Sequence, residues 1–284
     1  MRVGLGLLLL PLLLPTGCAT VGTEPLPGQP PHHVEGGFRN LDPGFSRPSG
    51  WTRWSFFARR AWHSVISTRE FEAPRVANDG RVLRAGLENP SVTWIGHSTL
   101  LVQLDGLNVL TDPHWGQRAS PLSWVGPRRL NAPGLGFEDL PRIDVVVISH
   151  DHYDHLDLDT VKRLAAAHDP LFLVPLGLKA WFAEHGMMHV EELDWWQSHE
   201  HREVRFVCVP AQHFAQRNLV DGNTRLWASW AIVGAERRLF FGGDSGYFSG
   251  FRETGERLGP FDLAAIAIGA YKPAEIMKAV HTNP

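Results

Sequence analysis

The chain has 284 residues, of which 43% are hydrophobic and 20% are charged, so it carries enough apolar material for one large core or two small ones. The formal net charge is −3 and no basic stripe occurs along the chain, which argues against a nucleic-acid-binding surface that works by electrostatic attraction. No short-period repeat is evident.

The first 17 residues have the pattern of a secretory signal. Arg2 precedes an apolar stretch, residues 4–14, which is too short to span a bilayer comfortably and contains a proline that disfavours a buried helix. Pro15-Thr16-Gly17-Cys18 follows, and this pattern predicts a lipoprotein-type signal peptide over residues 1–17 with Cys18 as the acylated first residue of the mature chain. Ordinary secretory cleavage nearby is the alternative, because Pro15 stands where leucine is usual.

Residues 18–37 are rich in proline and glycine, which predicts an extended tether between the lipid and a domain over residues 38–284. We therefore expect an exported bacterial membrane lipoprotein, located at the outer membrane and facing the periplasm. If Cys18 is lipidated, Cys208 lies alone within a strand pattern. No intrachain disulfide is then expected, and Cys208 is interpreted as a small buried hydrophobe.

Residues 51–62 mix arginine with tryptophan and phenylalanine. As a helix, this segment could lay aromatic rings and cations on a lipid surface. The alternative is an N-terminal helix that packs on the domain with its arginines in solvent. The chain has eleven tryptophans, which could line a groove for an acyl chain, although most are expected in the core.

The strongest chemical signal is residues 149–157, which hold three histidines and three aspartates. They follow the apolar run 143–148, whose continuous hydrophobicity is typical of a central strand. His150 and His152 are two residues apart, so in an extended segment both imidazoles project to the same side and can share one metal ion. Imidazole and carboxylate are ligands that zinc accepts.

Asp154 and His155 come next, where the chain is expected to turn into a helix marked by Leu158, Val161 and Leu164. That turn would direct both side chains toward a second cation. One loop could therefore serve two metals. The alternative is a solvated surface loop, since this chain has 15 histidines.

Two further candidate ligands follow predicted strands downstream. His213 comes after the β-branched and aromatic run 206–209, and Asp244 comes after an apolar run that ends in two glycines. A carboxylate in the position of Asp244 could bridge two metals. Taken alone, His213 could be a hydrogen-bonded strand-end histidine and Asp244 could stabilise a turn.

Three more residues are candidates for orienting the ligands. His97 and Asp112 each lie just past an apolar run that could be a strand facing the site. Asp157 either orients a ligand histidine or caps the following helix.

The order H-x-H-x-D-H, strand-end histidine and strand-end aspartate resembles the ligand order of the metallo-β-lactamase superfamily. Within it, residues 38–284 look most like the N-acylphosphatidylethanolamine-hydrolysing phospholipase D family. The segments that carry this closer resemblance are Trp94-Ile95-Gly96-His97-Ser98-Thr99, Thr111-Asp112-Pro113, Arg118-Ala119-Ser120-Pro121, Gly126-Pro127-Arg128-Arg129, Val174-Pro175-Leu176-Gly177-Leu178, Leu193-Asp194-Trp195-Trp196 and Ile268-Gly269-Ala270-Tyr271.

The resemblance implies an α/β fold, the metallo-β-lactamase αββα sandwich, with two zinc ions at one edge between the sheets. It implies one zinc on His150, His152, His213 and Asp244, and the other on Asp154, His155 and the shared Asp244. In the family a further histidine, on a His-Trp-Gly segment, completes the second site. The sequence ends at Pro284 before such a segment, so the domain is expected to be truncated at its C-terminus; the alternative is that water or another donor completes the site.

The resemblance also suggests the chemistry. His281 matches a family histidine that lies near the metals without normally binding them, so Asp154, Asp244 and His281 are the candidate catalytic residues. A hydroxide that bridges the metals would attack a phosphodiester, as in a phospholipase D. Alternatives are a lactonase or other metal-dependent hydrolase, or a lipid-anchored zinc-binding protein without turnover. Iron or manganese would also suit a His/Asp site.

The expected partners are a phospholipid or other small-molecule substrate and, through the N-terminal lipid anchor, a membrane. No nucleic-acid partner is expected. The sequence does not indicate an oligomeric state.

Overall fold

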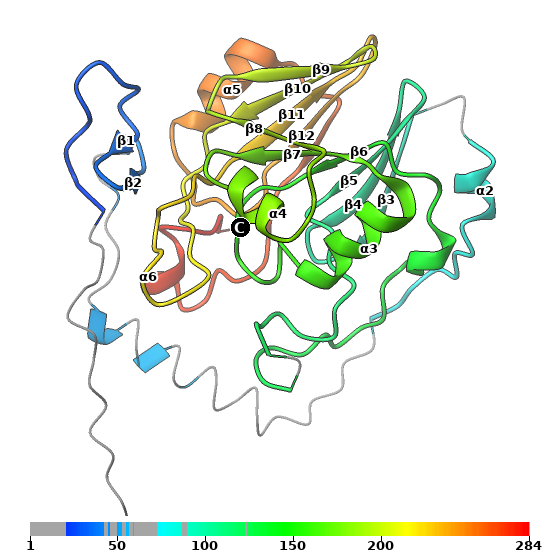
Figure 1. The fold of residues 1–284 in the computed structure, drawn as a ribbon, viewed down its shortest axis with the longest axis horizontal. Helices are drawn as coiled ribbons and strands as arrows, with labels where there is room; N and C mark the ends of the chain where they lie inside the picture. The colour runs from blue at the N-terminus through cyan, green and yellow to red at the C-terminus, as the bar shows by residue number, and fades with distance from the viewer. Residues whose placement is uncertain are drawn as a thin grey trace, which may run out of the picture.

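The computed structural model describes residues 21–283, apart from 43–44, 46–49, 53–54, 57–58, 60–72, 87–89 and 123. The predicted signal peptide and Cys18 lie outside the described residues, as does most of the segment 51–62. The described chain forms two facing β-sheets with helices on their outer sides (Figure 1).

The first sheet has six strands in sequence order. They are β3 (Ser91–Gly96), β4 (Thr99–Leu104), β5 (Leu107–Thr111), β6 (Val145–Val147), β7 (Leu171–Pro175) and β8 (Val190–Leu193). The first three strands pair antiparallel and the remaining pairs are parallel. The helices that follow β6 and β7 are α3 (Leu158–His168) and α4 (Lys179–Glu184). The shorter helices η1 (Phe137–Asp139) and α2 (Arg81–Arg84) belong to the same half.

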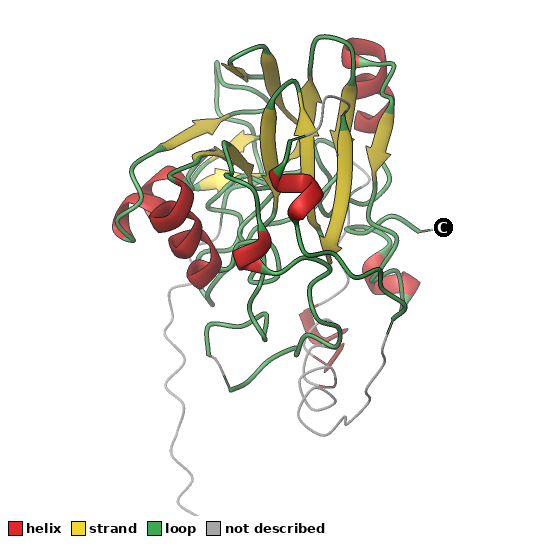
Figure 2. Cartoon of the chain, turned by 90° about the vertical axis from the view of Figure 1, so that its right-hand side faces the viewer, coloured by secondary structure: helices red, strands yellow, loops and turns green. Residues whose placement is uncertain are grey.

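The second sheet has five strands, in the order β13 (Leu263–Ala265), β12 (Arg238–Phe241), β11 (Ser229–Val233), β10 (Val204–Val209) and β9 (Ser198–His201). Its outer face packs against α5 (Gly250–Leu258). Helix α6 (Ala274–Met277) follows β13. The strands lie between helices on either side, as the rotated view shows (Figure 2).

Side-chain alternation explains how one apolar run serves two cores. Val145 and Val147 of β6 face the core between the sheets, whereas Val146 faces the core under α3 and α4. In β10, Phe206 and Cys208 face the core between the sheets and their neighbours face α5. Both faces of these strands are covered, so their sequences read as continuous hydrophobic runs rather than alternating ones. Cys208 is buried, as expected of a small hydrophobe.

The predicted αββα sandwich is therefore confirmed. One expectation needs correction: residues 22–37 are not an extended tether. They include the hairpin of β1 (His33–Val34) and β2 (Gly37–Phe38), and His32 and Val34 are buried. The reason is that His32 and His33 bind Asp194 of the domain through side-chain contacts that span some 160 positions of sequence.

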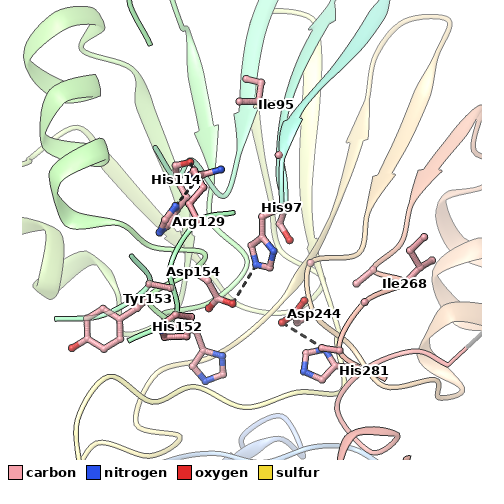
Figure 3. A pocket seen from close by; sticks show the side chains of 18 of the residues that line it. Ile95, His97, His114, Arg129, His152, Tyr153, Asp154, Asp244, Ile268 and His281 are labelled. Carbon is pink, nitrogen blue, oxygen red and sulfur yellow. Dashed lines mark hydrogen bonds and ion pairs between the residues drawn. The ribbon is translucent and has the colours of Figure 1, made fainter. Parts of the chain in front are cut away.

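The topology brings five loops to one edge of the sandwich. Strands β3, β5 and β6 run in the same direction, as do β10 and β12, because β4 and β11 run antiparallel between them. The residues that follow the carboxyl ends of these five strands carry the polar side chains that the sequence singled out. Figure 3 shows His97, His152, Asp154 and Asp244 among them. None of the helices that the structure describes is long and apolar enough to cross a bilayer.

Candidate metal centre

Three histidines from the two sheets converge at this edge. Nε2 of His150 lies 2.8 Å from Nδ1 of His152, and Nε2 of His213 lies 3.3 Å from the same atom. His150 and His152 belong to the loop after β6, whereas His213 follows β10. The spacing of His150 and His152 therefore places both imidazoles on one side, as the strand geometry suggested, and the facing sheet supplies the third donor.

A second group lies beside the first. Oδ2 of Asp154 is 3.2 Å from Nε2 of His97 and 3.9 Å from Nε2 of His155. Oδ2 of Asp244 is 3.2 Å from Nε2 of His155 and 3.9 Å from Nε2 of His213. Asp244 thus stands between the two groups, where a bridging carboxylate would stand. His97 is closer to the centre than an orienting role requires, because its imidazole faces Asp154 directly.

Asp112 supports both groups from behind. Its Oδ2 lies 2.7 Å from Nδ1 of His155, and its two oxygens accept hydrogen bonds from the backbone N–H and the hydroxyl of Ser149. The Ser149 hydroxyl in turn lies 2.8 Å from Nδ1 of His150. One buried carboxylate therefore fixes the ring orientation of histidines in both groups. The sequence indicated Asp112 but not Ser149, whose only signal was its place between the strand and His150.

His213 is held by segments distant in sequence. Its Nδ1 lies 2.8 Å from the carbonyl oxygen of Val280, and its backbone N–H and C=O both bond the side-chain amide of Asn40. Neither partner gave a sequence signal, because each is brought near only by the fold. His281 follows Val280, and its Nδ1 lies 3.7 Å from Oδ2 of Asp244 (Figure 3).

Asp157 differs from the expectation. It occupies the residue before α3, but its Oδ2 accepts hydrogen bonds from the backbone N–H of Gly116 and the hydroxyl of Thr160. No hydrogen bond joins it to a candidate ligand within the residues that the structure describes. The donors to its carboxylate therefore come from the loop after β5 and from a side chain of the first helical turn. The carboxylate neither orients an imidazole nor caps the backbone N–H groups of α3.

Burial keeps the first group of histidines in the form that binds metals. Burial lowers the pKa of His150 well below its ordinary value, and the neighbouring histidines His155 and His152 lower it further. Burial likewise lowers the pKa of His213 well below the ordinary value, although Asp244 acts against it. Both imidazoles are therefore neutral near pH 7, which is the state that coordinates a metal.

The second group contains two carboxylates, Asp154 and Asp244, whose negative charge favours binding of a cation. Burial acts to raise the pKa of Asp244, but His155 and His213 outweigh burial and lower it. Burial acts to lower the pKa of His155, but Asp244, Asp154 and Asp112 raise it well above the ordinary value. Three carboxylates surround this buried imidazole, and their negative charge favours its protonated form. A bound cation would neutralise the same negative charge in place of the proton.

The donor chemistry therefore fits the two metals that the resemblance implied. Nε2 of the fully buried His155 makes no hydrogen bond within the described residues and faces the carboxylates of Asp244 and Asp154. Imidazoles and carboxylates from both sheets meet at one place. The residues that would hold the ions are His150, His152, Asp154, His155, His213 and Asp244.

A separate group, His32, His33 and Asp194, has metal-binding composition but is already satisfied. Each carboxylate oxygen of Asp194 is taken by one imidazole, at 2.6 Å and 2.8 Å. The ring of His32 also stacks on Trp195 at 4.2 Å between centroids. This group fastens the N-terminal hairpin to the domain.

The centre opens into a cavity of about 2380 Å³. His97, His152, Asp154, Asp244 and His281 line its polar part. The rest of the wall is mixed. It includes the cations Arg75, Arg128, Arg129 and Arg217, and apolar side chains of which several are well exposed: Trp94, Leu219, Ile266, Ile268, Ile276 and Met277. The cavity exceeds the roughly 300–1,000 Å³ that is usual for small-molecule sites.

Comparison with known proteins identifies the family of the chain. A model of the beta-lactamase superfamily domain matches residues 107–284. The chain is 41% identical over 264 residues to N-acyl-phosphatidylethanolamine-hydrolyzing phospholipase D 1 of Caenorhabditis elegans, covering 84% of this chain and 74% of that protein. It is 33% identical over 199 residues to the mitochondrial N-acyl-phosphatidylethanolamine-hydrolyzing phospholipase D of Saccharomyces cerevisiae, covering 68% of this chain and 42% of that protein.

A solved structure shares the fold. Igni18, a metallo hydrolase of Ignicoccus hospitalis, superposes with a TM-score of 0.50 at 20% identity, over 64% of this chain and 71% of that chain. The family model, the relatives and the shared sandwich thus agree. The chain belongs to the metallo-β-lactamase superfamily of metal-dependent hydrolases and, within it, to the family of the N-acyl-phosphatidylethanolamine-hydrolysing phospholipases D.

Proposed function

We propose that the protein hydrolyses a phosphodiester bond of a phospholipid such as N-acylphosphatidylethanolamine, in a phospholipase D type of reaction that depends on two zinc ions. The observation that carries this proposal is a large cavity that reaches the candidate ligands His152, Asp154, His213 and Asp244 and that also has apolar side chains in its walls. When bound, the ions would supply an activated water nucleophile and positive charge for the phosphate oxygens.

The cavity suits a lipid diester better than a small polar substrate. The polar centre would receive the phosphate, while Trp94, Ile266 and Ile268 offer apolar surface for acyl chains. We propose that Asp154 and Asp244 hold the ions and the attacking water, and that His281 donates a proton to the leaving oxygen. The position of His281 in the cavity wall beside Asp244 supports this role.

The test is release of phosphatidic acid from N-acylphosphatidylethanolamine in mixed micelles by the metal-loaded protein. His152→Ala is expected to lose activity by at least about 100-fold, because it removes one imidazole of the first group. His189→Ala, which changes an exposed histidine away from the centre, is the matched control and should retain activity. Metal content is measured by mass spectrometry on the same samples.

The outcomes separate the alternatives. Activity that depends on His152 supports the phosphodiesterase proposal. Full metal loading without release of phosphatidic acid refutes it and favours a lactonase or another hydrolase of the superfamily. Iron or manganese in the active protein would refute zinc while leaving the reaction intact.

We also propose that the mature protein is anchored to the bacterial outer membrane through lipidated Cys18, facing the periplasm. The apolar stretch and the cysteine that follows it support this proposal. Labelling with radioactive palmitate in cells should mark the wild-type chain and not Cys18→Ser. Equal labelling, or no labelling of either protein, would contradict it.

A further inference from the structure

A cation that forms no direct ion pair within the described residues lies in the cavity wall next to the candidate metal centre. The guanidinium of Arg129 lines this cavity and is partly buried, and none of its nitrogens forms an ion pair within the described residues, although Asp157 acts on it through space. Burial lowers the pKa of Arg129, with Asp157 acting against burial, yet a guanidinium remains charged at any physiological pH. A partly desolvated, unpaired charge is costly, so its presence here calls for an explanation.

One edge of this guanidinium is fastened to the loop after β5. Nε donates to the carbonyl oxygen of Gly116 at 3.1 Å, and Nη2 donates to the carbonyl oxygen of His114 at 2.6 Å. Nη2 also lies 2.8 Å from Nδ1 of His114. Because a guanidinium can only donate, Nδ1 of His114 must accept, and this imidazole is neutral with its proton on Nε2.

The other edge is unused. Nη1 makes no hydrogen bond within the described part of the chain and lies against Gly96, the residue before His97. His97 faces Asp154 of the candidate centre at 3.2 Å. Figure 3 shows Arg129 and His114 on the same side of the cavity as His97 and Asp154. The fixed edge therefore orients a free donor beside the place where the reaction is proposed.

His114 is built into the wall rather than exposed in it. It is buried, and its Nε2 has no hydrogen-bond partner within the described residues. A buried donor without an acceptor does not stabilise the fold. We therefore explain the contact between His114 and Arg129 by the orientation that it gives to the guanidinium. The sequence drew no attention to His114, because it stands in a loop with no ligand spacing.

We propose that Arg129 binds an anionic oxygen of the substrate phosphodiester through Nη1, and that His114 is the residue that positions it. Arg129 would thereby select anionic diesters over neutral esters or lactones that the metals alone would accept. This inference rests on the proposed function, because it assigns the recognition of the phosphate charge to a residue outside the metal ligands. A charge-assisted hydrogen bond of this kind changes affinity about 10- to 100-fold.

The experiment compares bis(4-nitrophenyl) phosphate with its methyl ester, which is neutral at phosphorus and larger by one methyl group. In the zinc-loaded full-length protein, Arg129→Gln should lower kcat/KM for the diester about 10- to 100-fold and change that of the triester less than about threefold. Arg237→Gln is the control for loss of one positive charge. Arg237 precedes β12, at the end of the strand opposite to Asp244, and forms an exposed ion pair with Asp262.

A binding measurement keeps this inference separate from the proposed function. Dimethyl phosphate is titrated calorimetrically into the zinc-loaded wild type and Arg129→Gln, and its Kd should rise about tenfold in the variant. If the wild type cleaves no diester but this difference persists, the proposed function fails and anion recognition stands. Equal Kd values, or equal losses of kcat/KM with both substrates, would overturn the role of Arg129.

The positioning role of His114 is tested by removing and then replacing the atom that accepts from Arg129, Nδ1. His114→Leu removes the atom that accepts from Nη2 and should raise KM for the diester at least about fivefold with kcat nearly unchanged. His114→Asn offers Oδ1 in its place and should restore KM to within about twofold of the wild type. Equal damage by both variants, with thermal unfolding unchanged, would show that His114 acts through packing and would refute the positioning role.

Discussion

At the scale of single residues, Asp112 joins the two groups of the candidate centre, because its carboxylate contacts both His155 and Ser149. Its left-handed backbone (φ 36°) and full burial place one carboxylate behind both groups of ligands. Asp112→Asn would turn one accepting oxygen into a donor facing Ser149 or His155. We expect the free energy of unfolding to fall by about 2–4 kcal/mol and metal affinity to fall about 10- to 100-fold. Urea unfolding and metal titration measure these effects, and unchanged metal affinity would contradict the supporting role.

Gly243 shows how closely the two halves of the centre approach each other. A Cβ at this position would lie 2.6 Å from Cβ of Ser149, and the backbone has φ 55°. Gly243→Ala should therefore displace Ser149 and lower the free energy of unfolding by about 2–4 kcal/mol. Gly106→Ala is the matched control, because Gly106 has φ 72° but nothing within 4 Å, so only backbone strain of about 1 kcal/mol is expected. Equal effects in thermal unfolding would mean that the close approach does not matter.

At the scale of elements, the loop after β6 is attached to the facing sheet by a tryptophan. Nε1 of Trp230, in β11, donates to the carbonyl oxygen of Ile148 at 2.8 Å, just before the histidine loop. Trp230→Phe should cost about 2–4 kcal/mol of stability, since it leaves a buried carbonyl without its donor and a cavity in the core. Trp124→Phe, at an exposed side chain, should cost less than about 0.5 kcal/mol. Similar midpoints in denaturant for both variants would refute this attachment.

The elements show why the sequence predicted some features and not others. The strand over 145–147, the histidine loop and α3 are signalled by neighbouring residues, because hydrophobic runs and ligand spacing are local properties. The fold class followed from motifs in a recognisable order. The tether expectation for residues 18–37 failed because proline and glycine content says nothing about Asp194, which binds His32 and His33. Partners such as Asn40 and Val280 were likewise invisible, since only the tertiary fold brings them to His213.

At the scale of the whole molecule, the same hairpin contact makes stability depend on pH. Burial acts to raise the pKa of Asp194, but the hydrogen bonds from His32 and His33 outweigh it and lower the pKa. A lowered folded-state pKa stabilises the protein above the ordinary aspartate value of about 3.9, and this contribution is lost as pH falls through the lowered pKa. Asp194→Asn should therefore cost about 1–3 kcal/mol at pH 7 and progressively less below about pH 4.

Denaturant unfolding of wild type and Asp194→Asn from pH 3 to pH 7 measures this difference. Asp169→Asn, at an exposed aspartate, should change the free energy of unfolding very little at any pH. If the difference in free energy of unfolding between wild type and Asp194→Asn stays constant down to pH 3, packing rather than charge holds the hairpin.

The position of the candidate centre across the two sheets has a mechanical consequence. His150, His152, Asp154 and His155 follow a strand of one sheet, whereas His213 and Asp244 follow strands of the other. Cations held between them would therefore link the two sheets at the open edge of the sandwich and stabilise the folded chain by mass action, because the ligands come together only in that state. We expect the loaded protein to resist heat better than the stripped one, and the two sheets to part first at this edge when the metal is withdrawn.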